Sequence, residues 1–449
     1  MPLISDVDVI AAIATPPGQG GIGVVRVSGA QLSSLIEGVV GGPLSPRHAT
    51  LTRFVGESGE ILDEGIAIYF PGPNSYTGEN VLELHGHGGR TVMSLVLNRC
   101  LALGARIAEP GEFTRRAYMH GKLDLAQAEA VADLIAASTA EAARSALRSQ
   151  QGEFSKACAD LVKELIELRT WVEGGLDFPD ESLDPVDKTG LSRMLSEIQD
   201  RLDALLALAR QGKMLRDGVS AALVGRPNVG KSSLLNRLAT AEISIVTDIP
   251  GTTRDVIREQ LQINGVPINI VDTAGLRDPK GEVEKIGVER AWAEVRRVEV
   301  VVLVLEATRG VLEADRAIAA GIPDGVPVVR VFNKIDLLAT APKREKLDGE
   351  VALWLSAKTG AGIELLRSAL LDVAGWQPTG EGVFIARQRH LQALGKAREC
   401  LRSASAHLAQ TELLAEELRL AQEALASISG EFVADDLLGE IFSRFCIGK

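Results

Sequence analysis

The chain has 449 residues, of which 46% are hydrophobic, and a formal net charge of −12 at pH 7. This length is enough for about three domains, and the acidic balance argues against a broad basic face for nucleic acids. No apolar run has the length of a membrane span, and the first residues lack the basic stretch of an export signal. The four scattered cysteines fit neither a disulfide framework nor a zinc site. We therefore expect a cytoplasmic protein with no membrane contact.

The predicted elements form four segments in chain order. Residues 1–121 place short strands between Gly- and Pro-rich turns, which predicts an α+β domain. Residues 122–215 have helical periodicity, and residues 379–449 return to it. Residues 216–378 alternate strands with helices, which is typical of a doubly wound, mostly parallel sheet. We interpret the second and fourth segments as one helical domain into which the third is inserted.

One helix of the second segment has an expected end. Apolar residues recur at helical spacing from Leu161 to Val172, which predicts a stripe that packs on another helix. The pair Gly174–Gly175 follows directly, and two glycines weaken a helix. We expect the helix to end there.

The third segment begins with a phosphate-binding motif. Residues 225–232 read GRPNVGKS and fit the pattern GxxxxGK[ST], with an apolar strand at 219–224 before them and the helical string SSLLNRLA after them. Backbone N–H groups of such a loop surround the phosphates, Lys231 reaches the β and γ oxygens, and the Ser232 hydroxyl binds Mg²⁺. The sequence therefore predicts a nucleotide-binding P-loop domain.

Three later motifs indicate which nucleotide binds. DTAG at 272–275 ends an apolar run with a carboxylate that can orient Mg²⁺ through water. NKID at 333–336 brings Asp336, whose carboxylate can accept hydrogen bonds from N1–H and the 2-amino group of guanine. Adenine lacks this donor pair, so the site favours GTP over ATP. The string SAK at 356–358, which follows a predicted strand, is the last of these nucleotide-binding motifs in chain order.

The hydrolytic group is harder to assign from the residues alone. Thr253, in the segment TDIPGTTRD, is expected to close over the γ-phosphate and Mg²⁺. Many GTPases orient the attacking water with a Gln directly after the DxxG motif, but Leu276 occupies that place here. Glu282 and Glu284 are both acidic candidates nearby, and the chemistry does not distinguish them.

Two other residue patterns suggest chemistry and have simpler explanations. His85 and His87 share one face of a strand, but no third metal ligand is evident, so hydrogen bonding is favoured. Cys446 lies near the end of the chain and could be a nucleophile. Free cysteines are more often small buried hydrophobes, so we keep it outside the catalytic set.

Several strings together resemble one family. The chain contains GRPNVGKSSLLN, GTTRD, DTAGLR, NKID and SAK, and also ATPPGQGGIGVVRVSG, SYTGENVLELHGHGG, KLDLAQAEAV and a final FCIGK. These closely resemble the MnmE (TrmE) family of tRNA-modification GTPases, from near residue 10 to Lys449. The GTPase motifs alone would also fit an Era- or Der-like ribosome-assembly GTPase switch, which is the alternative.

The resemblance implies an architecture and a reaction. It implies an N-terminal domain that binds folate and forms a homodimer, a helical domain, and an inserted GTPase domain. The family works with the flavoprotein MnmG, which carries FAD, and adds an aminomethyl or carboxymethylaminomethyl group to the wobble uridine of tRNA. The one-carbon donor is 5-formyltetrahydrofolate or a related folate. The tRNA is expected to be held jointly with the partner.

The resemblance also implies site residues. It selects Glu284 as the catalytic, water-orienting residue, with Lys231 on the phosphates, and K⁺ in the charge-neutralising role of an arginine finger. The implied GTP-binding residues are Asn228, Val229, Gly230, Lys231, Ser232, Ser233, Thr247, Asp248, Ile249, Pro250, Gly251, Thr252, Thr253, Asp272, Thr273, Ala274, Gly275, Asn333, Lys334, Ile335, Asp336, Ser356, Ala357 and Lys358. The K⁺ ligands are Asn228, Thr247, Ile249 and Thr252, the Mg²⁺ ligands are Ser232 and Thr253, and the folate residues are Arg26, Glu83, Lys122 and Lys449.

Overall fold

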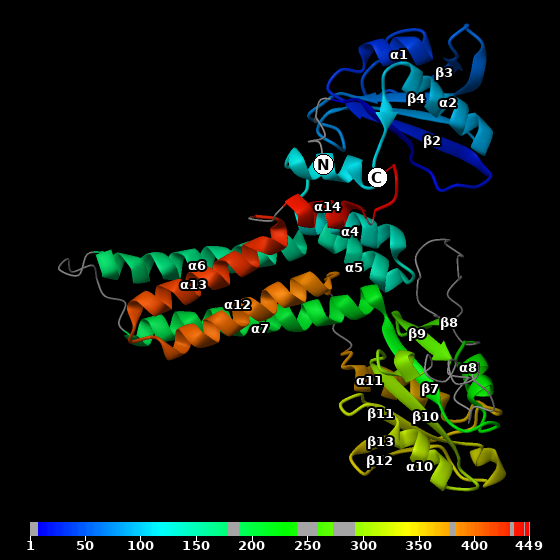
Figure 1. Ribbon diagram of the computed structural model, residues 1–449, viewed down its shortest axis with the longest axis vertical. Helices are drawn as coiled ribbons and strands as arrows, with labels where there is room; N and C mark the ends of the chain where they lie inside the picture. The colour runs from blue at the N-terminus through cyan, green and yellow to red at the C-terminus, as the bar shows by residue number, and fades with distance from the viewer. Residues whose placement is uncertain are drawn as a thin grey trace. The chain divides into compact units, whose positions relative to one another are not determined.

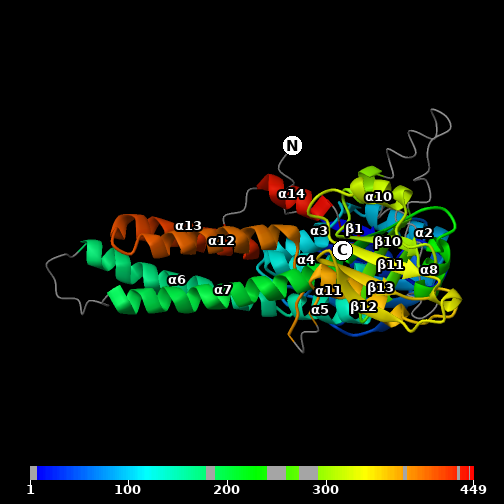
Figure 2. The ribbon, with the colours of Figure 1, turned by 90° about the horizontal axis from the view of Figure 1, so that it is seen from below.

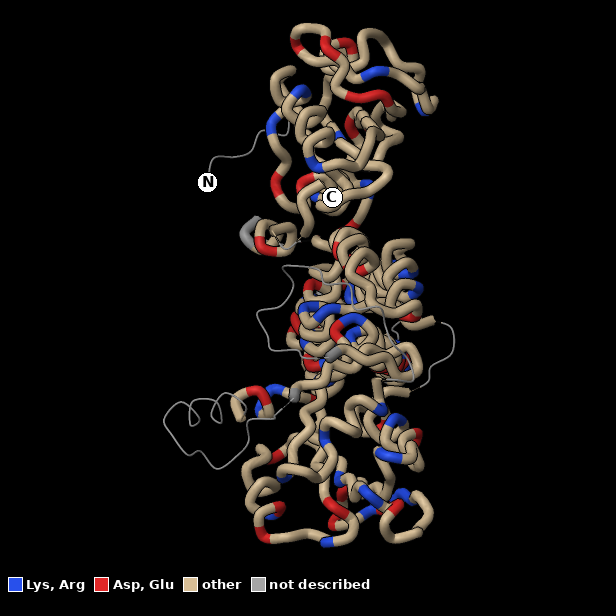
Figure 3. The backbone as a smooth tube through the Cα atoms, turned by 90° about the vertical axis from the view of Figure 1, so that its right-hand side faces the viewer, with Lys and Arg blue, Asp and Glu red and all other residues tan. Residues whose placement is uncertain are grey.

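The computed structural model describes residues 8–177, 188–239, 259–272, 292–377, 382–431, 435–443 and 445–448. The chain divides into two compact units. The first unit comprises residues 1–132, 149–198 and 396–449, and the second comprises residues 133–148 and 199–395. Basic and acidic residues are interspersed along the described backbone of each unit (Figure 3).

The first unit contains a sheet with the strand order β3-β4-β5-β2-β1-β6. Its strands are β1 (Ile10–Ile13), β2 (Gly20–Gly29), β3 (Thr50–Val55), β4 (Ile61–Phe70), β5 (Asn80–Gly88) and β6 (Arg106–Ile107). Neighbouring strands are antiparallel except β1 and β6. Helices α1 (Ser33–Val40) and α2 (Arg90–Ala102) cover one face of the sheet (Figure 1). The core lies between the sheet and these two helices, where alternate strand residues such as Val25, Val27 and Leu84 are fully buried.

Helices make up the rest of the first unit. They include α3 (Glu112–Met119), most of α4 (Leu125–Ala136), α6 (Glu153–Asp177), α13 (Thr411–Ser429) and α14 (Asp435–Ser443). Helices α6 and α13 lie side by side (Figure 2). Two further helices, α7 (Lys188–Asp217) and α12 (Gln388–Ala406), have residues in both units.

The expected end of α6 is wrong, because the helix continues through Gly174–Gly175 to Asp177. Leu161, Leu165 and Leu168 are buried in the predicted stripe, and α13 packs along this helix. Two glycines lower helix propensity by about 1 kcal/mol each, whereas each fully buried Leu contributes about 1.5–3 kcal/mol. Tertiary packing therefore outweighs the local propensity.

The second unit contains a sheet with the strand order β12-β13-β11-β10-β7-β9-β8. Its elements are β7 (Val219–Val224), α8 (Lys231–Ala239), β8 (Glu259–Ile263), β9 (Val266–Asp272), β10 (Val300–Glu306), α10 (Glu313–Ala320), β11 (Val328–Asn333), a 3₁₀ turn at Ile335–Leu337, β12 (Lys343–Leu347), β13 (Glu350–Trp354) and α11 (Ile363–Ala374). The central strands are parallel, and the edge strands β8 and β12 are antiparallel to their neighbours. Helix α5 (Ala140–Gln150) also belongs mainly to this unit.

Helices lie on both faces of this second sheet. Helices α8 and α11 pack on the face that carries Ala221 and Leu223, whereas α10 packs on the face that carries Ala222 and Val224. Strand β10 is buried along most of its length because it has packed helices on both sides. The predicted class, a doubly wound and mostly parallel sheet together with helical and α+β parts, is confirmed.

Candidate functional site

Residues 225–230 of the phosphate-binding motif form a tight loop between the end of β7 and the start of α8. A side chain at Gly225 would lie 2.4 Å from the Val304 carbonyl oxygen, and one at Gly230 would lie 2.3 Å from Nδ2 of Asn333. Both glycines have positive φ, and Asn228 has φ 63. The loop therefore needs these small residues to approach its neighbours.

Lys231 stabilises the same loop from the first turn of α8. Its Nζ donates hydrogen bonds to the carbonyl oxygens of Gly225, at 2.7 Å, and Arg226, at 2.9 Å. Ser232 and Ser233 follow on the helix and are exposed. The ammonium group and the positive end of the helix dipole together favour an anion at this position.

Asn333 connects the phosphate loop with two later loops. It ends β11 and is only 2% exposed. Its Nδ2 donates to the Val229 carbonyl oxygen at 2.8 Å, and its Oδ1 accepts from the N–H groups of Lys334, at 2.8 Å, and Ala357, at 2.9 Å. One buried side chain thus fixes the 225–232, 333–336 and 356–358 segments against each other.

Asp336 lies in the 3₁₀ turn next to this junction. The Ser356 hydroxyl donates to its Oδ1 at 2.6 Å, which fixes the orientation of the carboxylate. Lys334 has φ 72, and its Nζ lies 3.5 Å from Oε2 of Glu306. A carboxylate has about four acceptor sites, so Asp336 retains acceptors for a base that presents two adjacent N–H donors.

Part of the predicted site lies outside the described residues. This part comprises the switch segment 247–253, residues 273–275, the catalytic candidate Glu284, the other acid Glu282, and Lys449. Asp272 ends β9, at the same edge of the sheet as the phosphate loop, because β7 and β9 are parallel neighbours.

The predicted folate residues Arg26 and Glu83 are brought together across paired strands. They are directly opposite in the β2–β5 register, and Nε and Nη2 of Arg26 donate to Oε1 of Glu83 at 3.0 and 2.8 Å. Nε2 of His85 lies 3.1 Å from the other oxygen of Glu83. Lys122 is tied elsewhere, since its Nζ donates to the Pro73 carbonyl at 3.2 Å.

Two aromatic residues that we did not predict flank Arg26. Its guanidinium carbon lies 5.4 Å from the ring centre of Tyr76 and 5.9 Å from that of Phe113. Burial raises the pKa of the Tyr76 hydroxyl, although its hydrogen bond with Thr114 and the charge of Arg26 act in the opposite direction. These contacts are long-range in sequence, so no local pattern could have indicated them.

The two histidines are engaged by carboxylates. His87 Nδ1 lies 2.7 Å from Asp63, and His85 contacts Glu83 as above. Within the described ranges, no group of three His, Cys, Asp or Glu side chains could hold a metal ion.

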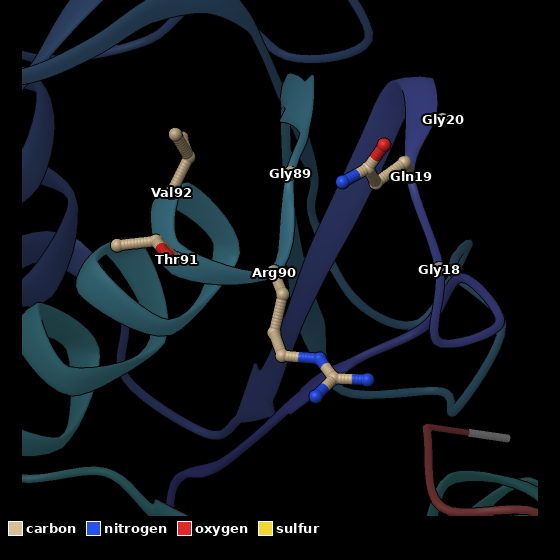
Figure 4. A pocket seen from close by; sticks show the side chains of 7 residues that line it. All are labelled: Gly18, Gln19, Gly20, Gly89, Arg90, Thr91 and Val92. Carbon is tan, nitrogen blue, oxygen red and sulfur yellow. The ribbon is translucent and has the colours of Figure 1, made fainter.

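A cavity of about 660 Å³ lies at the start of β2 and α2. It is lined by Gly18, Gln19, Gly20, Gly89, Arg90, Thr91 and Val92, and Figure 4 shows the Arg90 and Gln19 side chains beside it. None of the predicted site residues lines it.

The fold and the site define a class of protein. A mostly parallel sheet carries a phosphate loop after one strand, and a carboxylate suited to guanine after another, which is the arrangement of a P-loop GTPase. Residues 9–122 match the family model described as GTP-binding protein TrmE N-terminus, and residues 125–446 match the MnmE helical domain.

Curated relatives extend this similarity over the whole chain. A relative from Nitrosomonas europaea, named tRNA modification GTPase MnmE, is 56% identical over 98% of this chain and 99% of its own length. Relatives of the same name from Azoarcus sp. (58% identity, 98% of each chain) and Thiobacillus denitrificans (55%, 100% of this chain and 99% of the relative) agree. The chain belongs to the MnmE (TrmE) family, and the predicted resemblance is confirmed. The Era- or Der-like alternative is not favoured, because it would leave the N-terminal and helical matches unexplained.

Among the described helices, none combines the length and the apolar character that a membrane crossing needs.

Proposed function

We propose that this chain is a K⁺-stimulated, Mg²⁺-dependent GTP hydrolase that works with the flavoprotein MnmG, which carries FAD. Together they would add an aminomethyl or carboxymethylaminomethyl group to the wobble uridine of tRNA in the cytoplasm. The names of the curated relatives support tRNA modification. The observation that carries GTP binding is the Asn333 junction, because it fixes the phosphate loop beside the guanine-recognition loop.

The phosphate side of the site supports Mg²⁺-dependent hydrolysis. Lys231 lies against the loop carbonyls, where its ammonium can reach phosphate oxygens. The exposed hydroxyl of Ser232 would hold Mg²⁺ together with Thr253. Bound Mg²⁺ would neutralise charge that develops on the phosphates. Glu284 would orient the attacking water.

Asn228 supports the proposed cation site. It would hold K⁺ together with Thr247, Ile249 and Thr252, and it is the member of this set whose structure is described. Its left-handed backbone is one that Asn adopts more readily than most residues, and its amide oxygen is a suitable ligand. Bound K⁺ would supply the charge of an arginine finger, an effect of about 10³–10⁵ in rate.

The paired strands β2 and β5 support the folate proposal. Glu83 would accept hydrogen bonds from the adjacent N–H donors of the pterin, and Arg26, Lys122 and Lys449 would bind carboxylates of the ligand. The Arg26–Glu83 pair is partly buried, with side chains 19% and 17% exposed, so it is both accessible and pre-ordered. We expect Arg26→Ala and Glu83→Ala to weaken binding of 5-formyltetrahydrofolate and leave GTP hydrolysis unchanged.

The face of the first sheet opposite α1 and α2 supports a homodimer, through its exposed part at β3 and β4. Leu51, Ile66, His85 and Val24 form one row across β3, β4, β5 and β2. Leu51 is 71% exposed and Ile66 is 40% exposed, and exposed apolar patches mark interaction surfaces. We expect Leu51→Asp with Ile66→Asp to convert a dimer into a monomer by light scattering. An unchanged mass would contradict this surface.

Single-turnover GTP hydrolysis in KCl and NaCl at matched ionic strength tests the proposed mechanism. We expect K⁺ to accelerate hydrolysis by about 10³-fold or more, on the scale of an arginine finger. Glu284→Ala should abolish the K⁺-stimulated rate without loss of GTP binding, whereas the matched control Glu282→Ala should retain it. Equal rates in the two salts would overturn the cation mechanism.

A further inference from the structure

Arg237, in the last turn of α8, reaches across to the loop at 356–358. Its Nε donates to the Ala357 carbonyl oxygen at 3.2 Å, and its Nη2 donates to the Lys358 carbonyl oxygen at 2.7 Å. We propose that Arg237 is a positioning residue for guanine recognition, which acts by holding this loop on the helix that follows the phosphate loop. The inference rests on the proposed GTP site, and it adds a residue outside the phosphate and guanine motifs.

A simpler role for Arg237 would be to complement the dipole of α8. A cation in the last helical turn is favourable at about 0.3–1 kcal/mol, and Arg237 occupies that turn. Its donors, however, are directed at two consecutive carbonyls that lie 120 and 121 residues further along the chain. The planar guanidinium suits such a pair of acceptors. The orientation of the Arg237 side chain is therefore explained by the 356–358 loop and not by the helix dipole alone.

Two residues of the 356–358 loop, Ser356 and Ala357, are also held by hydrogen bonds to other segments. The Ala357 N–H donates to Asn333 at 2.9 Å, and the Ser356 hydroxyl donates to Asp336 at 2.6 Å. The carbonyls that Arg237 holds are therefore next in sequence to the Ala357 N–H that fixes Asn333 and the Ser356 hydroxyl that fixes Asp336. A shift of the Ala357 and Lys358 carbonyls would therefore disturb the hydrogen bonds that position Asn333 and the Asp336 carboxylate.

The segments that hold Asn333 and Ala357 are tied near the two ends of helix α8. Asn333 connects to Val229 just before the helix begins. Arg237 stands six residues after Lys231, which is about 9 Å along a helix, and connects to Ala357 and Lys358. The 333–336 and 356–358 segments are thus held near the first and the last turn of the same helix.

Competitive displacement of a fluorescent guanine nucleotide from the full-length chain tests the proposal, with GTP, GDP and ATP as competitors. For Arg237→Met we expect GTP and GDP to bind about five- to tenfold more weakly, the effect of losing two partly exposed hydrogen bonds. ATP affinity should stay unchanged, because ATP depends on the phosphate loop alone. At saturating GTP, the single-turnover rate should equal that of the wild type.

Two further variants separate positioning from a loss of stability. Arg237→Lys keeps one donor group and should recover part of the GTP affinity. Arg344→Met removes an exposed guanidinium that pairs with Asp372 at 2.6 Å, and it should bind every nucleotide as the wild type does. Unchanged GTP affinity in Arg237→Met, or an equal loss for GTP and ATP, would overturn the inference. A wild type that does not prefer GTP to ATP would overturn the proposed function and this inference with it.

Discussion

The side-chain amide of Asn333 donates a hydrogen bond of 2.8 Å to the backbone carbonyl of Val229, across 104 residues of sequence. Both groups are buried, so the bond is shielded from water and its loss leaves an unpaired carbonyl, at a cost of about 1–3 kcal/mol. This contact fixes the two halves of the nucleotide site relative to each other, because it connects the end of β11 to the phosphate loop.

Replacing Asn333 should therefore weaken the whole site. We expect Asn333→Ala to reduce GTP and GDP affinity about tenfold or more and to lower the thermal midpoint, because Val229 and Ala357 both lose their partner. Titration calorimetry and thermal unfolding measure the two effects. The matched control is Asn269→Ala, which removes a 2.9 Å bond to the Asp217 carbonyl in the same unit. Equal losses of GTP affinity in both variants would contradict the special role of Asn333.

Asp336→Asn should change the preferred base. Ser356 fixes Oδ1 of this side chain, so the new amide nitrogen would face the base as a donor. We expect GTP affinity to fall roughly 100-fold or more, and xanthosine triphosphate to bind better, because its C2 carbonyl accepts where guanine donates. Competition binding with GTP and xanthosine triphosphate measures this change in base preference.

The control for that exchange is Asp348→Asn, a carboxylate 73% exposed between β12 and β13. It should leave both affinities unchanged. A loss of GTP binding in Asp336→Asn with no gain for xanthosine triphosphate would mean that Asp336 does not read the base directly.

A buried ion-pair cluster should make the first unit sensitive to acid. Burial would raise the pKa of Glu112, but hydrogen bonds from Arg106, the Glu109 N–H and Arg116 outweigh burial and lower this pKa below its usual 4.5. The charged carboxylate therefore adds stability above about pH 4.5, and this contribution is lost as the pH falls through the lowered pKa of the folded state.

We expect Glu112→Gln to destabilise the first unit at pH 7 by about 3 kcal/mol, because a buried Arg116 loses a charged partner. The difference from the wild type should shrink below about pH 4. The wild type and the variant are compared by hydrogen exchange of peptides from β1 and α3. Exchange is measured at pH 7 and in short pulses after incubation at pH 3.5. A difference that is equal after both incubations would contradict the assigned cause.

The four cysteines should differ strongly in reactivity. Cys446 is exposed, whereas Cys100, Cys158 and Cys400 are buried. Burial raises the pKa of Cys100 to about 12, so only about 10⁻⁴ of this thiol is thiolate at pH 8. We expect iodoacetamide to label Cys446 first and Cys100 only after unfolding, as read by mass spectrometry of peptides. Equal labelling rates for Cys100 and Cys446 in the folded chain would contradict the burial.

The sequence predicted those parts of the fold that depend on strong local patterns. The strand at 219–224 and the helix after it were predicted because a continuous apolar run leads into a glycine-rich loop and an amphipathic repeat. The end of α6 was predicted wrongly because packing against α13 outweighs two glycines. The order of the motifs indicated the class, whereas the roles of the individual site residues stay predictions.

Contacts between distant segments could not be predicted. Asp133, at the end of α4, accepts hydrogen bonds from Arg216, at 2.8 Å, and Arg387, at 2.7 Å, which stand shortly before β7 and α12. No spacing rule connects these three positions, and the same holds for Arg237 and its two carbonyls. Such pairs exist only because the fold brings the segments together.

The measurement that tests the central proposal most directly is the nucleoside composition of tRNA from bacteria that lack their own MnmE-family gene and express this chain. We predict that the wild type restores the modified wobble uridine, as detected by liquid chromatography and mass spectrometry. Lys231→Ala, expressed at the same level, should not restore it. Unmodified wobble uridine in cells whose wild-type chain is folded and hydrolyses GTP would contradict the proposed function.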